Sequence, residues 1–179
     1  LSLQSRNTKP VLTSSFYWRR HRDHFILFRD DPSVYENFHR NDVLGGELSV
    51  QLASVAGISK AAISVRRESI QSSSLGFDLP ESITDRFNDS ASYSHGHSRL
   101  LPSLTLNHTL QVKKLKLSGG MLVHSHQGIG VYPGIDLSYE LIPFLEVRAG
   151  INRSMRLPSF TDLFYQGPQN VGNPDLEAE

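Results

Sequence analysis

Apolar and polar residues alternate strictly along several stretches of the second half of the chain. Between Ser103 and Val112 one set of alternate positions is apolar and the other is polar, and only His108 interrupts the apolar set. Successive side chains of a β-strand point to opposite faces, so this period of two predicts a strand with one apolar and one polar face. The same alternation recurs at 115–123, 135–141 and 145–152 and, earlier in the chain, at 47–52.

The apolar members of this alternation should share one face of a sheet. They include Leu104, Leu106, Leu110, Val112, Ile135, Leu137, Tyr139, Leu145, Val147, Ala149 and Ile151. No segment carries the sustained apolar spacing of three and four residues that an amphipathic helix shows. The chain is therefore expected to be all-β.

Short and long connections alternate between the expected strands. We expect strands near 11–28, 38–55, 60–75, 92–111, 115–126, 132–141 and 144–157, with a strand end at 1–5. The links at 6–10, 56–59, 112–114 and 142–143 are short, those at 29–37, 76–91 and after 158 are long, and 127–131 is brief. Tight turns at one edge and longer loops at the other are typical of outer-membrane barrels. The pattern predicts an antiparallel meander of about seven strands, an incomplete part of a transmembrane β-barrel, with its apolar face toward lipid.

Composition is compatible with this interpretation but does not establish it. The chain has 179 residues, a formal charge of zero and no cysteine, so it offers no basic field for nucleic acid and no disulfide or thiolate site. No apolar run approaches the roughly 18 residues of a membrane helix. A barrel gives the same hydropathy as a soluble protein, because only alternate residues meet lipid. The chain begins at Leu1 and ends without an aromatic terminus, so we expect both ends to be cut.

The sequence contains few groups of residues that could form a metal site or a catalytic site. The pairs His95/His97 and His124/His126 each lie two residues apart, so on a strand each pair would share a face. No cysteine or closely spaced carboxylate completes a metal-ligand set, and we expect no metal and no cofactor. There is no phosphate-binding loop and no nucleophile motif, so we expect no enzyme activity.

Aromatic and charged residues gather near the start of the chain. Phe16, Tyr17, Trp18, Phe25 and Phe28 suit an aromatic girdle at the lipid–water boundary, although in a soluble β-sandwich they would fill the core. The charged run 19–24 would lie just past the membrane or face the lumen, and we expect a solvated, mutually paired patch there.

Two ordered blocks of sequence resemble the barrels of TonB-dependent outer-membrane receptors. The end of the chain carries Arg156-Leu157-Pro158, then Thr161-Asp162-Leu163-Phe164-Tyr165, then Gly172-Asn173-Pro174-Asp175-Leu176, in the order and spacing of that family, with Ala178 where a proline is usual. The motif positions are Arg156, Pro158, Asp162, Leu163, Asn173, Pro174 and Leu176. The segments 15–30 and 40–48 resemble the cobalamin- and siderophore-importing branch found in Bacteroidota.

The resemblance implies an active importer located in the cell outer membrane. Such a receptor binds a scarce, bulky nutrient and passes it inward when an energy-transducing complex, TonB–ExbB–ExbD, acts on a plug. We expect residues 1–179 to be a single partial barrel domain, with the signal peptide, plug and C-terminal strands outside it. Outer-membrane lipid, a small-molecule nutrient and a surface lipoprotein are the expected partners.

The nutrient itself is expected to be a corrinoid or a ferric chelate, by analogy with the family. Haem receptors of this family usually carry a histidine between the two motif blocks, and none occurs between Arg156 and Asn173. The alternatives are a soluble β-sandwich binding module, such as an adhesin or lectin, and a passive outer-membrane pore.

Ligand recognition is expected in the long loops 76–91 and 159–175. Their polar and aromatic side chains suit hydrogen bonding and stacking on a large polar ligand, although each of them could equally serve only to solvate its loop. The candidate ligand-binding residues are Asp78, Asn88, Tyr165, Gln166, Gln169 and Asn170.

Overall fold

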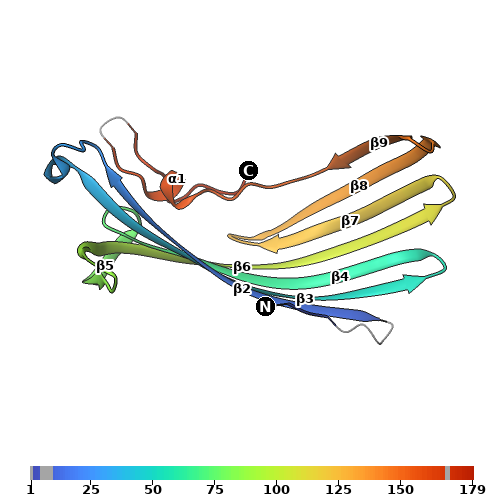
Figure 1. Cartoon of the computed structure of the whole chain (residues 1–179), viewed down its shortest axis with the longest axis horizontal. Helices are drawn as coiled ribbons and strands as arrows, with labels where there is room; N and C mark the ends of the chain where they lie inside the picture. The colour runs from blue at the N-terminus through green and yellow to red at the C-terminus, as the bar shows by residue number, and fades with distance from the viewer. Residues whose placement is uncertain (1, 5–9, 168–169) are drawn as a thin grey trace. The chain divides into compact units, whose positions relative to one another are not determined.

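The computed structural model describes residues 2–4, 10–167 and 170–179, which form an antiparallel sheet of nine strands. The strands are β1 (Ser2–Gln4), β2 (Val11–Ile26), β3 (Glu36–Ser54), β4 (Gly57–Ser72), β5 (Phe77–Asp85), β6 (Asn88–Val112), β7 (Leu115–Ser125), β8 (Ile129–Ile142) and β9 (Leu145–Asn152). Each pairs with the next along the chain, except that β5 pairs only with β6 and β4 is followed in the sheet by β6 (Figure 1). The prediction of an all-β antiparallel meander is confirmed.

Two short helical turns accompany the sheet. A 3-10 turn, η1 (Pro32–Val34), lies between β2 and β3, and a five-residue helix, α1 (Phe160–Phe164), follows β9. Among the described residues no helix is long and apolar enough to cross a membrane.

The expected strands match seven observed ones, and the differences lie in the long connections. The segment 76–91, expected to be a loop, contains β5, so that expectation was wrong. The last expected strand, 144–157, ends five residues early at Asn152. The expected turn at 6–10 lies outside the described residues except for Pro10.

The chain divides into two compact units. Unit 1 comprises residues 1–17, 45–66 and 101–155, and unit 2 comprises residues 18–44, 67–100 and 156–179.

In unit 1 the strand register joins the apolar positions into continuous rows. Leu110, Leu117, Leu137 and Ala149 are partners across β6, β7, β8 and β9, and Val112, Leu115, Tyr139 and Val147 form the adjacent row. The intervening polar rows include Gln111, Lys116, Ser138 and Arg148. Directly paired residues of neighbouring strands lie on one face, so the sharing of a face is confirmed. Contact of that face with lipid remains a prediction.

His108 interrupts the apolar rows without leaving its ring nitrogens unpaired. Its Nδ1 lies 2.9 Å from the hydroxyl oxygen of Ser59, and its Nε2 lies 3.1 Å from the carbonyl oxygen of Ala56. A neutral imidazole can accept from the hydroxyl and donate to the carbonyl, which reduces the cost of placing it on an apolar face.

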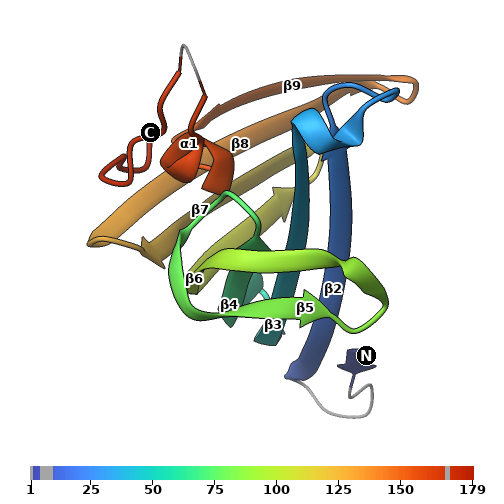
Figure 2. The same cartoon turned by 90° about the vertical axis from the view of Figure 1, so that its left-hand side faces the viewer.

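Unit 2 contains two small hydrophobic clusters. One joins Ile70 of β4 and Leu75, three residues after the end of β4, to Leu163 and Phe164 of α1. The other joins Phe38 of β3 to Ala91 and Tyr93 of β6. These contacts fix α1 and the β5–β6 hairpin to the strands of this unit, and Figure 2 shows the hairpin crossing in front of β3 and β2.

Asp85, at the tip of the β5–β6 hairpin, adds polar contacts to the cluster of Phe38, Ala91 and Tyr93. Its side chain is fully buried and accepts hydrogen bonds from the Phe87 backbone N–H, the Tyr93 hydroxyl and Nε of Arg22, at 2.9, 2.9 and 3.0 Å. The Phe87 N–H bond holds the pKa of Asp85 down to about 2 against the effect of burial, and the Arg22 and Tyr93 bonds act in the same direction. Asp85 therefore stays ionised at neutral pH.

Candidate ligand-binding cleft

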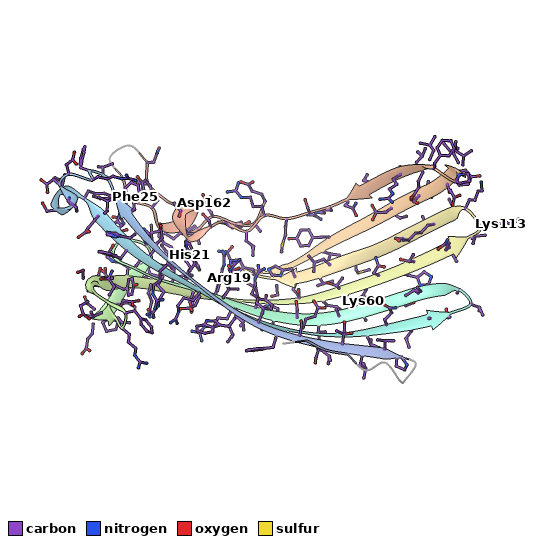
Figure 3. All side chains as sticks on the ribbon, in the orientation of Figure 1. Arg19, His21, Phe25, Lys60, Lys113 and Asp162 are labelled. Carbon is purple, nitrogen blue, oxygen red and sulfur yellow. The ribbon has the colours of Figure 1, made fainter. Side chains whose placement is uncertain are left out.

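Unit 2 contains a cleft of about 800 Å³. Strand β2 contributes Arg19, His21, Asp23 and Phe25, β3 contributes Asn37, His39 and Asn41, β4 and β6 contribute Glu68 and Arg99, and the segment after β9 contributes Ser159, Phe160, Thr161, Tyr165 and Gln166. Figure 3 labels Arg19, His21 and Phe25 in succession along β2. The volume lies within the range of small-molecule sites.

Strand alternation sorts the charged run of β2 into two sets. Arg19, His21 and Asp23 line the cleft. Arg20, Arg22 and His24 lie on the opposite face of the strand. Arg20 pairs with Asp42, which also borders the cleft, Arg22 pairs with Asp85, and His24 lies 3.0 Å from Glu36. The expectation of pairing within the run 19–24 is not met, because the partners of these even-numbered residues are acidic residues outside the run. The odd-numbered residues are available to a ligand in the cleft.

The cleft combines both charge signs with neutral hydrogen-bonding groups. Nδ1 of His39 lies 2.7 Å from the Ser72 hydroxyl, and burial lowers the pKa of His39 although the carboxylate of Asp23 opposes this. A lowered pKa makes the His39 imidazole neutral at pH 7, with one nitrogen that donates and one that accepts; Nδ1 is paired with Ser72, so Nε2 remains for a ligand. The cleft therefore suits a large ligand with several polar groups.

A buried arginine fixes one wall of the cleft. Arg99 forms an ion pair of 2.7 Å with Glu68, donates 2.6 Å to the carbonyl oxygen of Pro158 and places its guanidinium 5.0 Å from the centre of the Phe160 ring. Its side chain is only 9 % exposed. A charge so deeply buried is usually structural, and here it attaches the segment after β9 to β4 and β6.

The segment 156–179 is a closed loop held by a capping box. Its ends meet through two backbone hydrogen bonds between Arg156 and Glu179, of 3.0 and 3.1 Å. Within it, the Ser159 hydroxyl accepts from the Asp162 N–H, the Asp162 carboxylate accepts from the Ser159 N–H, and Arg156 pairs with that carboxylate at 3.1 Å. These reciprocal bonds start α1 at Phe160.

The second half of the family motif completes the closed loop from the other side. The N–H of Gly172 donates 2.6 Å to the Tyr165 carbonyl, and the N–H of Asn173 donates 3.1 Å to the Asp162 carbonyl. A Cβ at Gly172 would lie 2.8 Å from the Leu163 carbonyl carbon, so only glycine allows this approach. The side chain of Asn173 also caps the N–H of Asp175. The motif residues thus build a loop that presents Tyr165 and Gln166 to the cleft.

The predicted ligand-binding residues fall in different places. Tyr165 and Gln166 line the cleft. Asp78 lies on β5 with its carboxylate 3.2 Å from Nε2 of His95, and Asn88 caps the N–H of Ser90; neither is among the cleft residues. Asn170 closes a turn by accepting from the Gly167 N–H, and Gln169 lies outside the described residues. Proximity to a ligand remains untested for all six.

Sequence reasoning did not assign the β2 and β3 residues of the cleft. Arg19, His21 and Asp23 alternate with three paired residues, so a period-two reading of the charged run could have separated them. His39 and Asn41 carried no comparable signal, because their place beside β2 depends on strand pairing.

His97, of the first histidine pair, lies among aromatic rings. Among the described residues no group of three or more His, Cys, Asp or Glu side chains is arranged to hold a metal ion. His97 contacts the rings of Phe77, Phe160 and Phe164 at 5.5, 5.9 and 5.0 Å, so it belongs to the aromatic packing of α1.

Comparison with known proteins identifies the family. The family model described as TonB dependent receptor-like, beta-barrel, matches residues 11–179. A comparison with curated proteins finds no match. The matched region includes the seven predicted strands and the closed loop 156–179 that carries the sequence motif. The chain therefore belongs to the TonB-dependent receptor β-barrel family, a family of outer-membrane import receptors.

Proposed function

We propose that the chain supplies part of the barrel wall and ligand site of a receptor that imports a bulky nutrient, with a corrinoid or a ferric chelate as cargo. The observation that carries the proposal is the cleft of about 800 Å³ whose wall combines β2, β3 and the family-specific loop 156–179. Both cargo classes are large and carry many polar groups at their periphery, which the charged, imidazole and aromatic side chains of the cleft complement.

Transport would depend on the TonB–ExbB–ExbD complex acting through a plug, and a surface lipoprotein is a candidate partner at the outer side. A passive pore is the competing function. Dissipating the proton-motive force separates the two, because an active importer loses accumulation of cargo whereas a pore still equilibrates it. Cyanocobalamin and a ferric catecholate are suitable probes in cells that carry the intact receptor.

Point substitutions test the cleft more cleanly than loop deletions. Removing 76–91 would also remove β5 and Asp85, and removing 159–175 would destroy the closed loop, so loss of binding would then have a structural cause. Tyr165→Ala and His21→Ala each remove one cleft side chain. Each should weaken binding of the recognised probe about ten-fold, the loss expected for one hydrogen bond or ring contact of about 1.4 kcal/mol.

Val171→Ala is the matched control, because Val171 lies on the same loop, is 79 % exposed and does not line the cleft. Barrel assembly is checked in each variant by its resistance to unfolding in SDS without heating. Unchanged binding of both probes by correctly assembled Tyr165→Ala and His21→Ala variants would reject the cleft as the ligand site.

A further inference from the structure

The face of unit 2 opposite the cleft carries a second surface that the import function does not use. It consists of Trp18, Arg20 and Arg22 of β2 together with Arg86 and Phe87 at the β5–β6 tip, and is called the outward basic surface below. Trp18, Arg20 and Arg22 occupy alternate positions of one strand, so they share a face, whereas Arg19, His21 and Asp23 line the cleft.

The acidic partners of this surface lie beneath its arginines. Nε and Nη2 of Arg20 donate to the two oxygens of Asp42 at 2.8 and 3.1 Å, and Nε of Arg22 donates to Asp85 at 3.0 Å. The side chains of Arg20 and Arg22 are 31 % and 39 % exposed, against 21 % for Asp42 and 0 % for Asp85. The carboxylates therefore orient the guanidinium groups, while the charge that meets the surroundings is positive.

The tip of the hairpin adds a guanidinium that no carboxylate of the described residues neutralises. The Phe87 ring, 75 % exposed, lies 5.0 Å from the guanidinium carbon of Arg22 and 5.9 Å from that of Arg86. Within the described part of the chain Arg86 forms no ion pair. One aromatic ring thus holds two guanidinium groups close together, by the attraction of cations to its π face.

Several donors of these arginines are not used within the unit. Arg20 uses Nε and Nη2, and Arg22 uses Nε alone, so Nη1 of Arg20 and both terminal nitrogens of Arg22 point to no acceptor among the described residues. Guanidinium groups bind phosphate oxygens through paired N–H donors, with a geometry that fits this ligand better than a single ammonium charge does.

Trp18 indicates the level of the surface relative to a bilayer. Tryptophan is enriched where lipid headgroups begin, and its ring here is 60 % exposed with the indole N–H donating 3.0 Å to Asp42. At about 3.3 Å per residue and a strand tilt of about 45°, Arg20 and Arg22 lie about 5 and 9 Å further from the bilayer centre than Trp18, so they lie within and just beyond a headgroup layer of roughly 5–7 Å.

We propose that the outward basic surface binds phosphate groups of lipid in the outer leaflet of the membrane. The inference rests on the outer-membrane location of the family and is independent of the cargo. Trp18 and Phe87 would lie against the apolar and sugar portions of the lipid, while Arg20, Arg22 and Arg86 contact its phosphates. The surface would then fix the outer rim of the barrel against the headgroup layer.

The test measures binding of lipid by the intact receptor in detergent. Lipid A that bears both phosphates is titrated into the receptor, and the dephosphorylated lipid is titrated in parallel. The receptor should bind the phosphorylated lipid preferentially, and Arg86→Gln should weaken that binding about five-fold, the contribution of one basic residue near an anionic lipid surface. Arg86→Lys should retain most of the affinity, because the charge is kept.

The control removes one positive charge elsewhere. Lys113 lies in the short turn between β6 and β7 with φ of 54°, and Lys113→Asn suits that backbone because asparagine tolerates left-handed angles. It should bind lipid as the unmodified receptor does. Arg86 is exposed and forms no ion pair with the described residues, so Arg86→Gln should not affect folding. Unchanged uptake of cargo distinguishes this result from failure of the import function.

Three results would overturn the proposal. One is equal binding of phosphorylated and dephosphorylated lipid by the receptor. Another is equal affinity for the phosphorylated lipid in the Arg86→Gln and unmodified receptors. The third is full competition by inorganic phosphate at millimolar concentration, which would make the surface a site for free anions instead of lipid.

Discussion

Placing arginine at successive positions along β8 should reveal which face of unit 1 meets lipid and how deep each residue lies. Ile135 is seven positions from the end of β8 at Ile142, and its partner Gly119 is four positions from the start of β7 at Leu115. With about 3.3 Å per residue and a strand tilt of about 45°, the Ile135 row lies roughly 9–16 Å from the short turns. This is near the middle of an apolar band about 25 Å tall.

The expected cost follows from this depth. Ile135→Arg should destabilise the folded barrel by about 2–4 kcal/mol, which lowers the ratio of folded to unfolded receptor roughly 30- to 1000-fold. Leu137→Arg, two positions nearer the turn, should cost somewhat less. Leu141→Arg, beside the turn, should cost about 0–1 kcal/mol, because the side chain reaches the interface.

The choice of control depends on the strand register. Ser138 lies between Lys116 and Arg148 in neighbouring strands, so Ser138→Arg would add like-charge repulsion to any effect of sidedness. Ser118 instead faces Asp136 across the strand pair, and Ser118→Arg gains an opposite charge while losing one hydrogen bond of 2.9 Å to Thr109. Its net cost should stay within about 1 kcal/mol.

Urea titration of receptor folding into phosphatidylcholine vesicles measures these free energies, with folded and unfolded species separated by gel mobility. The reasoning predicts a decreasing series from Ile135→Arg through Leu137→Arg to Leu141→Arg, and a small effect of Ser118→Arg. A cost of Ser118→Arg equal to that of Ile135→Arg, or no dependence on depth, would refute the assignment of the apolar face to lipid.

Three further predictions concern unit 2. Asp85→Ala removes an acceptor of three hydrogen bonds and should lower the free energy of local unfolding of the β5–β6 tip by about 3–5 kcal/mol. Amide exchange at residues 86–93 should become faster, and unchanged exchange would contradict the role of Asp85. The pKa of Asp85 is lowered to about 2 in the folded state, so the stability that its carboxylate contributes is fully present above the unfolded pKa near 3.8 and is lost as pH falls toward 2. The protection of the tip amides against exchange should therefore not change between pH 5 and 8. Gly172→Ala should expose the closed loop 156–179 to proteolysis without preventing barrel assembly, because the added Cβ collides with backbone atoms of Leu163 and Tyr165. If the variant and the unmodified receptor resist protease equally, the loop tolerates the side chain.

The strands of unit 1 could be predicted because the alternation of apolar and polar residues lies within each strand. The alternation alone assigns Leu137 and Ser138 to opposite faces of the strand, without knowledge of the partner strand. The register, by contrast, is set between strands, so the polar row that joins Ser138 to Lys116 and Arg148 became visible only in the structure.

Strand β5 and helix α1 were missed for different physical reasons. Strand β5 contains Pro80 and has irregular pairing between Asp78 and Ile83, which removes the clean alternation that marks a strand. Helix α1 is only five residues long, too short for a helical period, and it depends on its capping box and on packing against Ile70 and Leu75.

The cleft could be predicted only in part. The loop side of the cleft was expected, since Tyr165 and Gln166 follow a recognisable motif in a long connection. The strand side was not, because a charged run such as 19–24 does not show which members find acidic partners on neighbouring strands. The predicted girdle residues divide similarly: Phe25 lines the cleft and the ring of Tyr17 lies over Gly45, whereas Phe16, Trp18 and Phe28 are exposed and remain girdle candidates.

Site-directed spin labelling along β8 tests the central claim most directly. The 179 residues contain no cysteine, so single cysteines at positions 135 to 141 can be labelled one at a time in the reconstituted receptor once any cysteine outside them is replaced by serine. Labels at the odd positions should be relaxed by oxygen, which concentrates in lipid, and labels at the even positions by a water-soluble nickel chelate. Alternation of two residues with this phase is the predicted result, and the opposite phase or uniform access of the nickel chelate would contradict a transmembrane barrel with its apolar face in lipid.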